Sequence, residues 1–174
     1  KLRSKNTSII FLGGIVLKKL IRNLLALAFI GYMVLLIYFL FFSEEYGRTT
    51  HYTDYQYNLV LFREITRYIR HRDILGFNLV MINLVGNVVV FMPFGFFVPS
   101  LEKRRRGYFL DFLKISLLGF LFSLAVETVQ LVTKVGCFDV DDLFLNTIGV
   151  VLGYLCYGIC RFVWNFVRRK NSAS

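Results

Sequence analysis

An acidic residue, Glu127, lies within an apolar stretch of about residues 108–132, and Gln130 follows it at i+3 on the same helix face. If that stretch crosses a membrane, the carboxyl group is costly there and should face other helices rather than lipid. A carboxyl group in such a place can transfer a proton, attract a cation or bind a positively charged ligand. The structural alternative is a protonated Glu127 that joins helices through hydrogen bonds to Asn83 or Asn87.

Two other apolar stretches carry polar residues that reach a similar depth. Asn83 and Asn87 are one helical turn apart near the start of one stretch, and Asn146 lies one turn beyond Asp142 at the start of another. Because consecutive spans alternate in direction, the start of these two stretches and the end of the Glu127 stretch meet at the same membrane surface.

We therefore expect one polar site to which three helices contribute. Glu127 is the candidate for acid–base or charge chemistry. The candidate ligand-binding residues are Asn83, Asn87, Gln130, Asp139, Asp142 and Asn146. These residues require no cofactor, although Glu127, Asp139 and Asp142 would be the ligands if a divalent cation bound.

The aspartates also have a purely structural interpretation. Asp139 at an N-cap and Asp142 in the first turn would satisfy free backbone N–H groups at the positive end of a helix. Asp141 falls on another side of that helix and is expected to be solvated. Gly149 and Gly153, four residues apart, predict close helix packing.

The composition excludes several classes of protein. Of the 174 residues, 56% are hydrophobic and 18% charged, whereas a soluble domain has about 45–50% and about 25%. The net charge is +10, but the cations fall between apolar runs, which is the pattern of a membrane protein and not of a nucleic-acid-binding surface. Three cysteines cannot form a disulfide framework, and Cys137 is expected to be a free thiol.

The apolar runs define the predicted fold. Four runs, at about residues 24–42, 77–98, 108–132 and 142–163, reach the length of about 20 residues that a spanning helix needs. Their apolar character is continuous, which excludes a strand barrel, and residues 43–76 are too few for a second core. We predict an all-α integral membrane protein, a single membrane domain over residues 1–174 built as a four-transmembrane-helix bundle.

The distribution of Lys and Arg predicts the orientation. Basic residues concentrate in residues 1–23, 99–107 and 164–174, whereas residues 43–76 balance five basic residues with five acidic ones. The turn at residues 133–141 has one basic residue, Lys134. By the positive-inside rule both termini are cytoplasmic. Membrane lipids are the expected partners, with anionic inner-leaflet head groups at the basic segments, and no nucleic acid is expected.

Two further segments are predicted to be helices at the membrane surface. In residues 58–72 apolar side chains recur at helical spacing, and the opposite face carries Arg63, Glu64, Arg67, Arg70 and His71. This amphipathic helix is either an apolar anchor with a solvated face or a lid over the polar site. Residues 9–17 are too short to span, so they either form a second interfacial helix or lengthen the first span.

The spacing of the polar residues and glycines resembles the VanZ-like family of bacterial membrane proteins over residues 58–157. The resemblance lies in three motifs: Asn83-x3-Asn87-x3-Phe91-x-Pro93-Phe94-Gly95, then Glu127-x2-Gln130, then Gly136-x2-Asp139-x2-Asp142-x3-Asn146-x2-Gly149-x3-Gly153. Asn58-Leu59-x2-Phe62 is similar to the family's Asn-Leu-x-Pro-Phe element, with Leu61 in place of proline.

The resemblance implies a multi-pass cell-envelope protein of Gram-positive type in the bacterial cytoplasmic membrane. The family's founding member is associated with teicoplanin resistance, and relatives with lipoglycopeptides. The predicted function is reduced susceptibility to such antibiotics through a site facing the outer leaflet that engages a lipid-linked cell-wall precursor or a lipid-anchored lipoglycopeptide. The alternatives are an intramembrane carboxylate enzyme, metal-assisted or not, that acts on an envelope lipid, and a small transporter or flippase that works as a homo-oligomer.

Overall fold

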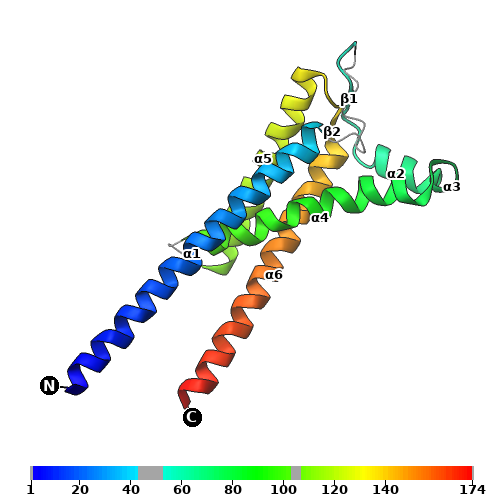
Figure 1. Ribbon diagram of the computed structural model, residues 1–174. Coiled ribbons are helices and arrows are strands. Elements are labelled where there is room, and N and C mark those ends of the chain that lie inside the picture. Colours follow the sequence, from blue (N-terminus) through cyan, green and yellow to red (C-terminus); the bar gives the residue numbers. More distant parts are fainter. Residues whose placement is uncertain (1, 43–52, 103–106, 174) are drawn as a thin grey trace.

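Four long helices dominate the computed structural model, which describes residues 2–42, 53–102 and 107–173 (Figure 1). They are α1 (Leu2–Phe42), α4 (Phe77–Leu101), α5 (Tyr108–Thr133) and α6 (Val140–Ala173). Each contains a segment long and apolar enough to cross a membrane, namely Val16–Phe42, Phe77–Leu101, Tyr108–Thr133 and Val140–Lys170. The prediction of four helices long and apolar enough to span a membrane is confirmed.

Helix α1 is longer than the first apolar run. It continues without a break from Leu2 to Phe42, so residues 9–17 lengthen the first helix, and no separate interfacial helix forms there. Lys18, Lys19 and Arg22 lie inside the helix because lysine and arginine are good helix formers.

Helices α4 and α6 form the most extensive helix pair and cross obliquely (Figure 1). Three glycines lie at the crossing, where an added Cβ on Gly95 would strike the carbonyl of Val150, one on Gly149 that of Val88, and one on Gly153 that of Met92. The two backbones are therefore in direct contact, as the spacing of Gly149 and Gly153 predicted.

All four long helices contribute to one apolar core, which includes residues of the crossing. Its buried members are Leu36, Phe91, Phe94, Ile115, Val150 and Tyr154. Helix α5 turns a single stripe of side chains inward, at Asp111, Ile115, Gly119, Ser123, Val126, Glu127 and Gln130. Four of these seven are polar or acidic, and they include Glu127 and Gln130, whose i, i+3 spacing predicted a shared face.

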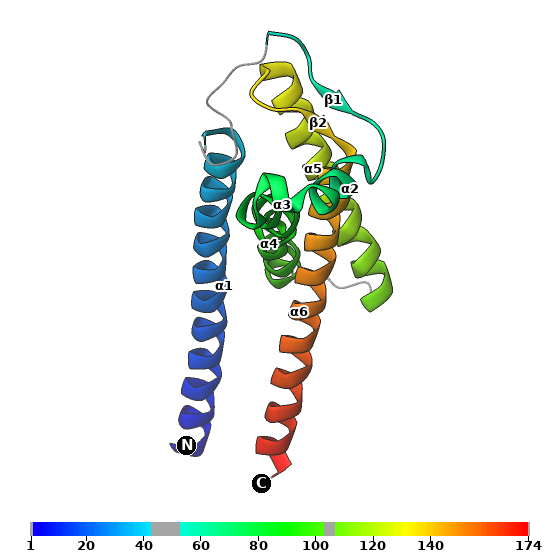
Figure 2. The same ribbon diagram turned by 90° about the vertical axis from the view of Figure 1, so that its right-hand side faces the viewer.

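Short elements cover one end of the long helices. Strands β1 (Tyr57–Asn58) and β2 (Phe138–Asp139) pair in parallel, with Asn58 opposite Asp139, and the short helices α2 (Arg63–Arg70) and α3 (Arg72–Leu75) follow β1. The helix predicted over residues 58–72 begins only at Arg63, because Asn58 pairs with Asp139 in the two-stranded sheet. The position of α2 at a membrane surface stays a prediction. Both chain termini lie at the opposite end of the molecule (Figure 2).

Candidate functional site

Glu127 is buried in the bundle, with 2% of its surface exposed. Its Oε2 accepts a hydrogen bond of 3.1 Å from the backbone N–H of Asp139. The carboxylate of Glu127 therefore attaches α5 to the short connection between α5 and α6. One turn further along α5, Gln130 donates from Nε2 to the carbonyl oxygen of Leu40 on α1 at 2.8 Å. Both residues face the interior, as expected, and each joins α5 to another part of the chain.

Asp139 is the N-terminal cap of α6 and also binds β1. Its Oδ1 accepts hydrogen bonds from the backbone N–H of Asp141 at 2.8 Å and from Nδ2 of Asn58 at 3.0 Å. Burial raises the pKa of Asp139, and the nearby charges of Asp141 and Glu64 act in the same direction, while the two hydrogen bonds lower it. The capping role predicted for Asp139 is confirmed.

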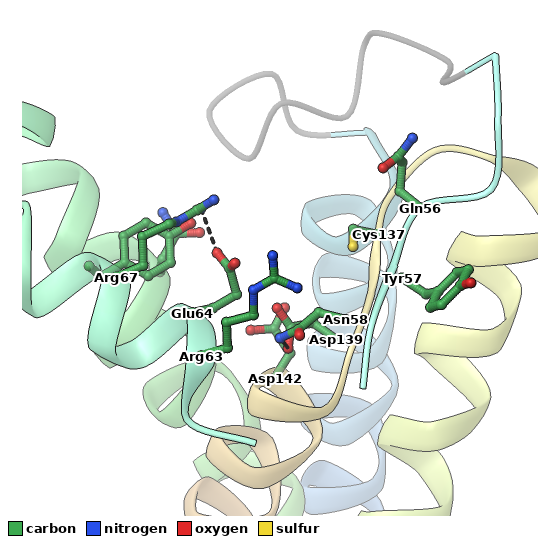
Figure 3. Close-up of a pocket in the computed structure, with 11 residues that line it drawn as sticks. Gln56, Tyr57, Asn58, Arg63, Glu64, Arg67, Cys137, Asp139 and Asp142 are labelled. Carbon is green, nitrogen blue, oxygen red and sulfur yellow. Dashed lines mark hydrogen bonds and ion pairs between the residues drawn. The ribbon is translucent and has the colours of Figure 1, made fainter. Parts of the chain in front are cut away.

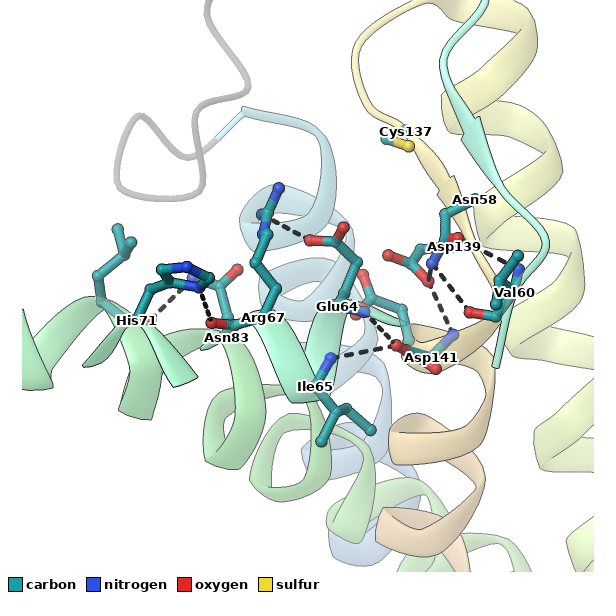
Figure 4. A network of polar contacts seen from close by, with 12 residues as sticks. Asn58, Val60, Glu64, Ile65, Arg67, His71, Asn83, Cys137, Asp139 and Asp141 are labelled. Atoms are coloured by element: carbon teal, nitrogen blue, oxygen red, sulfur yellow. Dashed lines mark hydrogen bonds and ion pairs between the residues drawn. The ribbon is translucent and has the colours of Figure 1, made fainter. Parts of the chain in front are cut away.

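The expectation that Asp141 is solvated is wrong. Only 1% of Asp141 is exposed, and its carboxylate accepts three backbone hydrogen bonds from the segment that begins α2. Figure 4 draws those from Glu64 and Ile65. Oδ1 binds the N–H of Phe62 at 2.5 Å, and Oδ2 binds those of Glu64 at 2.8 Å and Ile65 at 3.2 Å. A side chain of α6 thus supplies the cap that the first turn of α2 lacks in its own sequence.

The remaining predicted residues make three separate contacts. Asn87 of α4 donates from Nδ2 to Oδ1 of Asp142 at 2.6 Å. Asn146 donates from Nδ2 to Oγ of Ser123 on α5 at 2.9 Å. Asn83 donates to the carbonyl oxygen of Leu79 in its own helix.

A polar pocket of about 390 Å³ opens above these contacts (Figure 3). Its lining comes from the β1 segment, α2, α4, the α5–α6 connection and the start of α6: Gln56, Tyr57, Asn58, Arg63, Glu64, Arg67, Tyr68, Asn83, Cys137, Asp139 and Asp142. Three of the seven predicted site residues, Asn83, Asp139 and Asp142, line this polar pocket. The other four, Glu127, Gln130, Asn87 and Asn146, are not among its lining residues and make the contacts between elements described above.

The cations of the polar pocket come from α2. Arg63 lines the polar pocket together with Asp139 and Asp142, and Arg67 forms an ion pair of 2.5 Å with Glu64 (Figure 3). Sequence reasoning placed these side chains on the polar face of a helix but did not name them as site residues. The sequence feature that could have identified them is the amphipathic pattern of this helix, which was also interpreted as a lid over the polar site.

Lys134, the nearest cation to the aspartates in sequence, contributes elsewhere. It donates to the carbonyl oxygen of Thr53 at 2.7 Å and lies 4.9 Å from the centre of the Tyr55 ring. Asn58 is not among the predicted site residues, yet it is buried and donates to Oδ1 of Asp139.

The thiol of Cys137 lines the polar pocket and is free. Burial, together with the charges of Asp139, Glu127 and other carboxylates, raises the pKa of Cys137 to about 11. The thiol is therefore protonated at neutral pH and is a poor nucleophile.

The carboxyl groups considered as metal ligands are held by separate donors. Glu127 binds the Asp139 N–H, Asp139 binds Asn58, and Asp142 binds Asn87. Within residues 2–42, 53–102 and 107–173, no three Asp, Glu, His or Cys side chains are gathered as a metal ion would need.

Comparison with known proteins identifies the family. The VanZ/LLP1 family profile matches residues 29–161. This segment contains every residue that lines the polar pocket. Protein VanZ of Enterococcus faecium is 29% identical over 142 residues, which cover 82% of this chain and 76% of that protein. No solved structure matches the chain. With three quarters of its length matched by the family profile, the chain belongs to the VanZ/LLP1 family.

Proposed function

We propose that this chain is a cell-envelope protein of the bacterial cytoplasmic membrane that lowers susceptibility to teicoplanin-type glycopeptides and lipoglycopeptides. It acts by binding a lipid-linked or lipid-anchored ligand in the polar pocket. The family relationship supports the phenotype, because the founding member VanZ is associated with teicoplanin resistance. The observation that carries the proposal is the polar pocket itself, which is walled by both acidic and basic side chains at the end of the helices opposite to the termini.

The charge distribution supports an outward-facing polar pocket. The N-terminal segment and the C-terminal tail are both rich in Lys and Arg, and they lie at the end remote from the polar pocket (Figure 2). The positive-inside rule assigns that basic end to the cytoplasm. The chain is then N-in and C-in, and the polar pocket faces the outer leaflet, where lipoglycopeptides and lipid-linked wall precursors are found.

The lining favours a ligand that carries charges of both signs. The guanidinium groups of Arg63 and Arg67 suit phosphate or carboxylate groups. Asp139 and Asp142 suit an amine, and the side-chain amide of Asn83 orients neighbouring polar groups. Glu64 already neutralises part of the charge of Arg67, so Arg63 is the principal anion-binding side chain of this proposal.

Substitution of Arg63 tests the proposal with little risk to folding, because Arg63 is exposed on α2. The chain and its Arg63→Gln variant are expressed in a glycopeptide-susceptible Gram-positive host, and the minimum inhibitory concentration of teicoplanin is measured together with membrane abundance. Arg63→Gln should lose the protection at normal abundance. Arg70→Gln is the matched control, because Arg70 is an exposed arginine of the same helix that does not line the polar pocket. Full protection by Arg63→Gln would contradict the proposal.

The charge chemistry predicted for Glu127 has its own test. Glu127→Gln keeps a carbonyl oxygen that can accept the Asp139 N–H but removes the negative charge and the titratable proton. If Glu127 supplies charge or a proton to the ligand, Glu127→Gln loses protection at normal abundance. If protection persists in Glu127→Gln and fails only in Glu127→Ala, Glu127 is a positioning residue for Asp139.

The two alternative functions gain no comparable support. The intramembrane carboxylate enzyme, with Glu127 as its acid or base, stays a prediction; Cys137 is a poor candidate for its nucleophile because the pKa of the thiol is raised to about 11. A transporter of four spans would need self-association to enclose a path, and an oligomer stays a prediction that cross-linking in native membranes can test.

A further inference from the structure

A second, chemically different crevice lies at the end of the molecule that carries the termini. Its volume is about 480 Å³, and its walls come from α1, the C-terminal end of α4 and the C-terminal half of α6. We call it the basal crevice. In this region α1 and α6 lie apart from each other (Figure 2). It shares no lining residue with the polar pocket.

The lining of the basal crevice is apolar with a cationic edge. On α1 the apolar side chains of Leu17 and Ile21 are one turn apart, and Lys18 and Arg22 form a parallel cationic pair beside them. On α6, Trp164 and Arg168 are likewise one turn apart. Three cations from two helices thus surround a surface that is otherwise largely apolar.

The acidic residue of the lining does not cancel this charge. Glu102, at the end of α4, forms an ion pair and hydrogen bond with Lys114 of α5. Its negative charge is therefore already matched by a cation outside the basal crevice. The net electrostatic character of the lining is positive.

We infer that the basal crevice binds an anionic phospholipid, with its phosphate near Lys18, Arg22 and Arg168 and its acyl chains along Leu17, Ile21 and Trp164. A lipid suits the site better than a soluble anion because the crevice lies at the ends of membrane-spanning segments and its walls are apolar. Basic pockets between spanning helices favour anionic head groups, and each nearby cation contributes to the binding. Tryptophan is typical of the boundary between head groups and acyl chains.

The sole tryptophan of the chain, Trp164, provides a direct readout. The full-length protein is reconstituted in phosphatidylcholine vesicles that contain a minor fraction of phospholipid with brominated acyl chains, which quench tryptophan fluorescence on contact. Brominated phosphatidylglycerol should quench Trp164 more strongly than brominated phosphatidylcholine. Equal quenching by the two lipids would overturn the inference.

A pair of matched double variants separates this site from general attraction to a basic protein. Lys18→Gln/Arg168→Gln removes two cations of the basal crevice, whereas Lys19→Gln/Arg169→Gln removes the same charge from neighbouring positions that do not line it. The first variant should bind the anionic lipid roughly 30-fold more weakly, from about 1 kcal/mol per cation, and lose the extra quenching. The second should keep the extra quenching. Equal losses in both variants would refute a defined site.

Discussion

Replacing Asp141 by alanine should release the segment that carries α2 without unfolding the long helices. The carboxylate of Asp141 accepts the backbone N–H groups of Phe62, Glu64 and Ile65, which are 76 to 79 residues away in sequence. Phe62 has a φ of 65°, an uncommon conformation for a residue other than glycine. The hydrogen bonds to Asp141 hold the chain in this turn together with the edge-on contact between the rings of Phe62 and Phe144.

The size of the effect follows from the three bonds. A hydrogen bond to a charged group contributes roughly 1.5–3 kcal/mol, and loss of a helix cap alone costs about 0.5–2 kcal/mol. The three bonds share one carboxylate and lie in a partly buried segment, so their contributions do not add fully. A local destabilisation of about 3 kcal/mol corresponds to a roughly 100-fold increase in opening of this segment.

Hydrogen exchange with mass spectrometry, on protein in lipid nanodiscs, measures this opening directly. In Asp141→Ala the amides of Phe62, Glu64 and Ile65 should exchange roughly 100-fold faster, while those of α5 stay protected. Asp73→Ala is the control, because Asp73 lies in the same region and its side chain is 88% exposed. If exchange at residues 62–65 is unchanged in Asp141→Ala, this account of how α2 is held in place is wrong.

Three further predictions concern the helix crossing, the thiol and the attachment of α1. Gly153→Ala should lower the free energy of unfolding by about 1–3 kcal/mol, because the added Cβ would strike the carbonyl of Met92. Gly158→Ala should change it by less than about 0.5 kcal/mol, because the space around Gly158 is open. Thermal unfolding in detergent compares the two variants. Alkylation of Cys137, in a background without the other cysteines, should accelerate only as the pH rises toward about 11, and Asp139→Asn should shift that profile to lower pH because one negative charge is gone. Tyr32→Phe removes the hydrogen bond to the carbonyl oxygen of Val90 and should cost about 1 kcal/mol in the same unfolding measurement.

The four spans and the inward face of α5 could be predicted because both depend on properties of one segment. A run of about 20 apolar residues is sufficient to identify a span, and the i, i+3 spacing of Glu127 and Gln130 is sufficient to place them on one face. Both side chains are indeed buried. The close packing at Gly149 and Gly153 was predictable for the same reason.

The cover of the polar pocket could not be predicted in this way. Asp141 was expected to be exposed to solvent because only its position on its own helix was known. Its hydrogen-bond partners lie on a segment that is 76 to 79 residues away in sequence. The parallel pairing of Asn58 with Asp139 has the same long-range origin. Periodicity within a helix carries no information on which distant backbone groups will approach it.

The backbone contact between α4 and α6 has a consequence for genetics. Gly149 and Gly153 do not line either cavity, yet any side chain introduced there must push the two helices apart. That displacement would move Asn87 away from Asp142, which lies two turns nearer to the polar pocket than Gly149 does. In a saturation mutagenesis screen for antibiotic survival, these glycines should therefore score as severely as residues that touch the antibiotic or its target, so a map of sensitive positions would overstate the size of the contact surface.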